Sequence, residues 1–68
     1  MRSFNLKDDF IKLGQLLKAV HLVESGAEAK EKILAGQVLV NGEACTMRGK
    51  KLYPGDKVSF SDEEILLK

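Results

Sequence analysis

The spacing of apolar residues changes at Gly36, and no other feature of this sequence constrains the fold as strongly. Before Gly36, apolar residues recur every three or four positions, which is the spacing of one face of an amphipathic helix. After Gly36 they recur at every second position, as in a strand with one buried face. We therefore expect an α+β fold in which two consecutive helices pack on a small antiparallel β-sheet.

The first helix is predicted over residues 8 to 22. Asp8 and Asp9 suit its N-terminus, either as capping residues or as charges that complement the helix dipole. Gly14 is less favourable than Ala in a helix by about 1 kcal/mol, so we expect a packing or contact reason for it. Apolar residues follow one face of this helix at intervals of three, four and three: Phe10, Leu13, Leu17 and Val20.

The second helix is predicted from Ser25 to Gly36. Ser25 and Glu28 have the spacing of a capping box, in which the Ser hydroxyl and the Glu carboxylate each accept a hydrogen bond from a backbone N–H. Ala29 and Ile33 share a face, and Gly36 is suited to ending the helix. Start, body and end of this helix agree with one another.

The chain after Gly36 is predicted to form short strands joined by tight turns. Asn41-Gly42 is a strong hairpin signal, and residues 53–56 indicate a second turn. Residues 4–6 are expected to pair with the C-terminal strand. Strands are predicted at residues 38–40, 43–47, 57–60 and 65–67.

Composition limits the classes of function. A chain of 68 residues predicts a single domain over residues 1–68. The net charge of +1 neither favours nor excludes nucleic acid as a partner, so the positions of the charges matter more than their total. One cysteine (Cys45) and one histidine (His21) supply neither an internal disulfide nor a zinc site, and no cofactor is expected. No apolar run approaches the ~20 residues that span a membrane, so we expect a cytoplasmic protein, and we expect it to be a monomer.

Several motifs occur in an order typical of one known family. Leu13 to Lys18 reads Leu-Gly-Gln-Leu-Leu-Lys, and a basic Arg48-Gly49-Lys50-Lys51 loop precedes Pro54-Gly55-Asp56. Over roughly residues 10 to 60 the sequence resembles the S-four RNA-binding domain, in particular its short stand-alone bacterial members. The other matching positions are Lys12, Leu22, Val23, Ser25, Ala29, Lys30, Ile33, Gly36 and residues 38–42.

The resemblance implies an RNA-binding surface formed by two helices (the alpha-L motif) and the hairpin. It implies structured RNA of the ribosomal or transfer class as partner, with the ribosome as a further partner, and no catalysis. Two positions depart from the family pattern: Gly26 stands where many members have Arg, and Gly14 where many have an acidic residue. The missing Arg removes a fork-like phosphate donor.

The start of the second helix is the first candidate site. The backbone N–H groups around Ser25, Gly26 and Ala27, with the positive end of the helix dipole, are suited to a phosphate. Gly26 would allow close approach, because it has no side chain. The alternative is an ordinary capped helix whose Glu28 repels phosphate.

The basic loop is the second candidate site, because Arg48, Lys50 and Lys51 place three cations within four residues. Such a cluster binds phosphates with release of counterions; the alternative is a solvated turn. The resemblance adds Lys30 and Asn41, together with Lys12 and Lys18. The last two are six residues apart, about 240° of helical rotation, so a straight helix could not direct both to one side.

Three function classes were compared. RNA binding through the phosphate backbone explains the motifs and the separation of charges; a protein-interaction adaptor docking on a ribosome or an RNA-processing enzyme is the alternative. An enzyme is not expected, because no nucleophile, base or metal set can be assembled. Tyr53 could stack on a base, but a Tyr before Pro-Gly more often packs on the turn. A positive strip joining the second helix's start to residues 48–51 would favour RNA.

Overall fold

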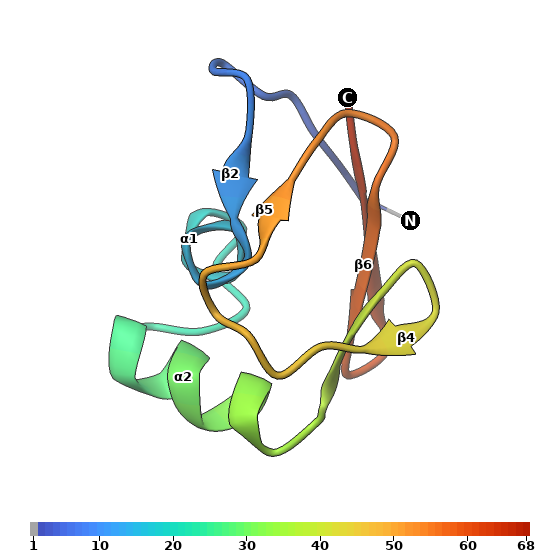
Figure 1. Ribbon diagram of the computed structural model, residues 1–68. Helices are drawn as coiled ribbons and strands as arrows, with labels where there is room; N and C mark the ends of the chain where they lie inside the picture. The colour runs from blue at the N-terminus through green and yellow to red at the C-terminus, as the bar shows by residue number, and fades with distance from the viewer. Residues whose placement is uncertain (1) are drawn as a thin grey trace.

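The computed structural model describes residues 2–68. Its helices and strands follow the order expected from the sequence, with additional short strands (Figure 1). The helices are α1 (Leu13–Ala19) and α2 (Gly26–Leu34), and the strands are β1 (Arg2–Phe4), β2 (Ile11–Lys12), β3 (Val38–Val40), β4 (Glu43–Ala44), β5 (Lys51–Leu52), β6 (Lys57–Phe60) and β7 (Glu63–Leu67). Within the described chain, no helix has the length and apolar character needed to cross a membrane.

A five-stranded sheet forms one layer, and both helices lie on the same side of it (Figure 1). Its strand order is β1-β7-β6-β3-β4, with every neighbouring pair antiparallel except β1 and β7, which are parallel. β2 and β5 form a separate antiparallel pair beside α1. The predicted α+β fold, with helices packed on a small and mostly antiparallel sheet, is confirmed.

The core lies between the helices and one face of the sheet. Val38 and Val40 of β3 are buried and Leu39 between them is exposed, which confirms the predicted spacing of two. The helices contribute Leu13, Leu16, Leu17, Ala29 and Ile33, and the other strands contribute Leu52, Val58, Phe60, Ile65 and Leu67. At about 25 cal/mol per Å² of apolar surface removed from water, burial of these side chains is the main favourable contribution to folding.

The helix predicted over residues 8 to 22 was wrong at both ends, because α1 spans only Leu13–Ala19. α1 begins at Leu13, because Ile11 and Lys12 pair with Leu52 and Lys51 in extended conformation. This pairing is between residues distant in sequence, and it prevents the helix from starting at residue 8. Asp8 and Asp9 therefore cap nothing, and Phe10 lies outside the helix, with its ring centroid 6.2 Å from that of Tyr53.

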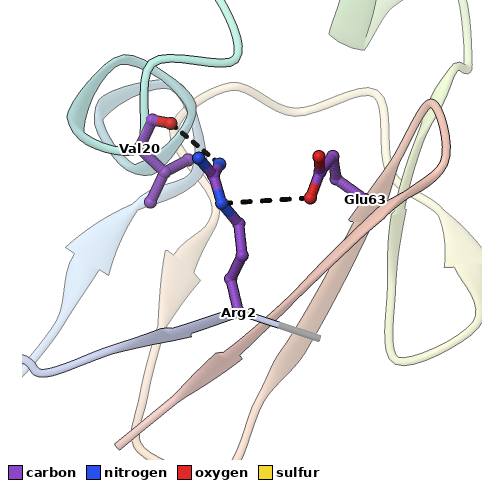
Figure 2. A network of polar contacts seen from close by, with 3 residues as sticks. All are labelled: Arg2, Val20 and Glu63. Carbon is purple, nitrogen blue, oxygen red and sulfur yellow. Dashed lines mark hydrogen bonds and ion pairs between the residues drawn. The ribbon is translucent and has the colours of Figure 1, made fainter.

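α1 ends in a left-handed residue. His21 has φ +61°, its N–H donates to the Lys18 carbonyl at 3.0 Å, and the Leu22 N–H donates to the Leu17 carbonyl at 3.0 Å. This is the Schellman arrangement, with His in the position that Gly usually takes. Figure 2 shows Arg2 next to this end: its guanidinium donates to the Val20 carbonyl at 2.9 Å and lies 3.9 Å from the Glu63 carboxylate.

α2 starts and ends as predicted, with one difference. The Ser25 hydroxyl accepts from the Glu28 N–H at 3.1 Å, but the Glu28 carboxylate accepts from the Glu24 N–H at 2.8 Å rather than from that of Ser25. The expected capping box is therefore only half formed. Gly36 has φ +76°, and its N–H donates to the Ile33 carbonyl at 3.0 Å, which closes the helix.

The predicted hairpin is confirmed, but its second strand is short. Asn41 and Gly42 have φ +52° and +88°, the pair of positive angles that a type I′ turn needs. Instead of residues 43–47, only Glu43–Ala44 forms β4. The chain then leaves the sheet and crosses toward the helices before it enters β5 (Figure 1). At the other end, β7 begins at Glu63 rather than at residue 65.

Pairing of the chain ends is confirmed with shifted bounds. β1 spans Arg2–Phe4 rather than residues 4–6, and its Phe4 faces Leu67 of β7. The Leu6 N–H continues the contact, donating to the Lys68 carbonyl at 3.0 Å.

Candidate functional site

The segment between β4 and β5 docks on the start of α1 through its backbone. The N–H of Leu13 donates to the Lys50 carbonyl at 2.9 Å, and that of Gly14 donates to the Arg48 carbonyl at 3.0 Å. A Cβ at Gly14 would lie 3.6 Å from that same carbonyl oxygen. The contact expected at Gly14 is therefore the one with the backbone of Arg48, and it brings the basic loop to the helices.

A hollow lies where α1, α2 and this loop meet, and we call it the cationic hollow. Its volume is about 370 Å³. Three of its lining residues are cationic and three are glycines, and no acidic residue of the described chain lines it. It is lined by Lys12, Gly14, Gln15, Lys18, Gly26, Ala29, Arg48 and Gly49.

Lys12 and Lys18 both line the cationic hollow, although a straight helix was predicted to separate them. Lys12 lies before the first helical turn, with φ −79° and ψ 148°, so the rotation of about 240° does not apply to it. Its N–H donates to the Gln15 side-chain oxygen at 3.3 Å. Lys12, Gln15 and Lys18 thus follow one side of the hollow at intervals of three residues.

The start of α2 presents unused donors beside the cationic hollow. Within residues 2–68, the N–H groups of Gly26 and Ala27 have no acceptor, whereas that of Glu28 bonds to Ser25. Apart from its chain neighbours and the backbone of its own helix, no described atom lies within 4 Å of where a Cβ of Gly26 would be. The Glu28 carboxylate is held at the Glu24 N–H and does not line the hollow. The start of α2 can therefore be an ordinary capped helix and a phosphate site at the same time.

The cations of the basic loop are divided between two places. Arg48 lines the cationic hollow, but Lys50 and Lys51 line a different one of about 630 Å³, the mixed hollow, together with Glu43 and Asp56. Lys51 also lies in β5, with its ammonium 4.9 Å from the centre of the Phe10 ring, a cation–π distance. Arg48 therefore shares a hollow with Gly26 and Ala29 of α2, whereas Lys50 and Lys51 do not.

Of the remaining predicted residues, some have side chains that are hydrogen-bonded within the fold and others are exposed. Asn41 donates to the Asp56 carboxylate at 3.1 Å and accepts from the Lys57 N–H at 2.9 Å, so its side chain holds the hairpin to the 53–56 turn. Ser25 is occupied as the cap of α2. Lys30 is exposed, one helical turn after Gly26, and Ala27 is exposed between them.

Sequence reasoning missed Gln15. Its position three residues after Lys12 and three before Lys18 was the available signal. The predicted base-stacking candidate Tyr53 is 48% exposed and lines the mixed hollow, with its ring tilted against Phe10.

A small antiparallel layer with two helices and a cationic hollow between them defines a class of nucleic-acid-binding modules. The family model described as "S4 domain" matches residues 4–68, so this chain belongs to the S4 domain family, the S-four family of the sequence analysis. The match extends beyond the 10–60 region in which the motifs were recognised.

Relatives of known name cover most of the chain. It is 43% identical over 56 residues to the "Probable ribosome maturation protein RlbA" of Bacillus subtilis (strain 168), covering 82% of this chain and 79% of that protein. It is 39% identical over 66 residues to the "Putative RNA-binding protein YbcJ" of Escherichia coli (strain K12), covering 96% of this chain and 94% of that protein.

A solved structure is similar as well. The solution structure of YbcJ from E. coli matches with a TM-score of 0.74 and 38% identity, covering 98% of this chain and 86% of that chain. YbcJ is described there as having an αL motif involved in RNA-binding.

Proposed function

We propose that this protein is a non-catalytic module that binds structured RNA through its phosphate backbone, with the cationic hollow at the centre of the interface. The observation that carries this proposal is the composition of the hollow: Lys12, Lys18 and Arg48 line it, and no acidic residue of the described chain does. Phosphate oxygens prefer such cations and free backbone N–H groups, which the start of α2 adds.

The class of RNA is part of the same proposal. We propose ribosomal or transfer RNA as the ligand and the ribosome as the setting; one relative is named for ribosome maturation and another for RNA binding, which supports RNA and a link to the ribosome. Each of these is a statement about the relative. A monomer with no cofactor, acting in the cytoplasm, is the simplest form of this proposal.

Local charge rather than total charge governs the expected affinity. The chain as a whole has a net charge of +1, so long-range attraction to RNA is weak. Each phosphate that a cation neutralises releases counterions, so affinity falls steeply as salt rises. Lys30, Lys50 and Lys51 are exposed as well, but Lys50 and Lys51 share the mixed hollow with Glu43 and Asp56.

The test is a double charge reversal, Lys18→Glu with Arg48→Glu. Both side chains are exposed and make no ion pair within residues 2–68, so the fold should persist. We expect affinity for a structured RNA to fall at least about tenfold, with a shallower salt dependence, because contacts to phosphates are lost. Fluorescence anisotropy at several salt concentrations measures both quantities.

The matched control is Lys68→Glu with Lys32→Glu, which changes the total charge by the same amount. Lys68 is exposed after β7, and Lys32 lies in the last turn of α2; neither residue lines the cationic or the apolar hollow. If control and test variants lose affinity equally, binding follows total charge and the cationic hollow is not the site. If neither loses affinity, RNA binds elsewhere.

An adaptor function remains the second candidate, because apolar side chains are exposed at the mixed hollow. Met47 is 64% exposed and lines this hollow beside Tyr53. Under the adaptor function, Met47→Ser would weaken association with ribosomal or RNA-processing proteins and leave RNA affinity unchanged. Under our proposal, the charge reversal has the larger effect on association with ribosomes.

A further inference from the structure

We propose that a second hollow, next to the cationic one, receives a single unstacked base of the bound RNA. This inference rests on the proposed function and names the kind of RNA that the site prefers: a helix interrupted by an unpaired nucleotide. The hollow has a volume of about 530 Å³ and lies between the N-terminal segment and α1. We call it the apolar hollow, after its main walls: Phe4, Leu6, Phe10, Ile11 and Ala19.

The two hollows are adjacent on α1. Gln15 and Lys18 line both of them, one side of α1 facing the cationic hollow and the adjoining side facing the apolar hollow. A phosphate bound at Lys18 would therefore have its nucleotide at the mouth of the apolar hollow. Neighbouring phosphates of the same strand would remain within reach of Lys12 and Arg48.

The walls suit a base better than they suit solvent. Phe4, Leu6, Phe10 and Ile11 are only partly buried in the folded chain, so their apolar surface is available to a ligand. Aromatic rings stack on any base, because every base has a π-face. Structured RNA offers such bases at bulges and loops, where they are not held in a helix.

The rim of the apolar hollow carries groups that can bond to the edge of a base. The Gln15 side-chain oxygen accepts a hydrogen bond from the Lys12 N–H, so the side-chain NH₂ group of Gln15 is left as a donor. Asp8 also lines the hollow and supplies an acceptor that could receive an exocyclic amine. Lys7 and Lys18 stand at the same rim and favour the phosphates on either side of the base.

These charges favour a nucleotide over an apolar protein side chain as the occupant. A protein side chain would use the walls alone and would leave Lys7 and Lys18 without anionic partners. A nucleotide uses the walls with its base and the lysines with its phosphates. The lining residues Gln15 and Lys18, which the two hollows share, point to the same strand of RNA in both.

The experiment compares two RNA hairpins that differ by one nucleotide. One is fully paired in its stem and the other carries an unpaired 2-aminopurine, whose emission reports on its surroundings. We expect the protein to bind the second hairpin at least about fivefold more tightly, because stacking adds to the phosphate contacts. We also expect the emission to change on binding.

A filling variant locates the base. Ala19 is exposed and lines the apolar hollow, so Ala19→Phe should occupy the space without altering Lys12 or Arg48. It should abolish both the preference and the emission change, while affinity for the fully paired hairpin stays within about twofold of the parent. Ala35→Phe, at the exposed C-terminal cap of α2, is the matched control and should retain both.

The outcomes separate this inference from the proposed function. Equal affinity of the parent protein for both hairpins, with no emission change, overturns the base pocket and leaves phosphate binding intact. A preference that survives Ala19→Phe also overturns it, because the base is then held elsewhere. If neither hairpin binds, the proposed function itself fails.

Discussion

His21 occupies a backbone conformation that costs an ordinary residue free energy. Its φ of +61° lies in the left-handed region, and its position after α1 is the one that Gly usually takes. The side chain is exposed, so no packing is lost if it is removed. The sequence predicted a helix over residues 8 to 22, which includes His21, so this strained backbone conformation was not expected.

His21→Gly should therefore stabilise the protein, by about 0.5–1 kcal/mol, because Gly adopts the left-handed region without a steric penalty. Urea unfolding monitored by circular dichroism measures the free energy of unfolding. RNA affinity should not change, since His21 does not line the cationic hollow. Lower stability of the variant would mean that a contact of the His21 side chain stabilises the fold by more than the backbone strain destabilises it.

Asn41 was a predicted RNA ligand, and its contacts give it a structural task. It bonds through both side-chain atoms, to Asp56 at 3.1 Å and to the Lys57 N–H at 2.9 Å, and it has φ +52°. Asn41→Ala should destabilise the fold by about 1–3 kcal/mol through these losses and the left-handed strain. Thermal unfolding measures this change.

Asn41→Gly is the matched variant, because it relieves the backbone strain and still removes both side-chain bonds. It should fall between the parent and the Ala variant in stability. RNA affinity of both variants, measured where each is folded, should match the parent. A selective loss of affinity without loss of stability would restore Asn41 to the RNA interface.

At the scale of elements, α2 could be predicted well and α1 could not. The limits of α2 are set by groups close in sequence: the Ser25 hydroxyl at its start and Gly36 at its end. The start of α1 depends on the pairing of Ile11 with Leu52, residues that are far apart in the sequence. Hydrophobic spacing alone included Phe10 in the helix, because this residue, which lies just before β2, fits the helical interval by coincidence.

The start of α2 gives a test at this scale. Ser25→Ala removes the acceptor of the Glu28 N–H, a bond of 3.1 Å, and should destabilise the protein by about 1 kcal/mol. Ser25→Asp, which keeps an acceptor at the cap, is the control and should retain stability. It also adds a negative charge beside Gly26, so it should weaken RNA binding while the Ala variant does not. Equal RNA affinity of all three proteins would remove the start of α2 from the interface.

At the scale of the whole molecule, the basic loop shows what sequence reasoning could and could not predict. Its family motif and its cations were recognised, and so was a contact at Gly14. The division of its charges was not predictable, because it depends on the bond between the Gly14 N–H and the Arg48 carbonyl. That bond directs Arg48 to the helices and leaves Lys50 and Lys51 at the mixed hollow.

The two faces of the sheet differ in the charged side chains that lie on them. The face away from the helices carries the ion pair of Lys57 with Glu64, at 3.4 Å, so its charges are balanced. On the side of the helices, Lys12, Lys18 and Arg48 are gathered without acidic neighbours at the hollow. A polyanion should therefore distinguish these two faces, even though the net charge of the chain is only +1.

The most direct test is a titration of the ¹⁵N-labelled protein with a short structured RNA, followed residue by residue in NMR spectra. The account predicts that the amide signals of Lys18, Gly26 and Gly49 move with a common affinity, while those of Ser59 and Glu64, on the opposite face, stay in place. Shifts concentrated at Ser59 and Glu64, or spread evenly over both faces, would contradict a binding surface at the cationic hollow.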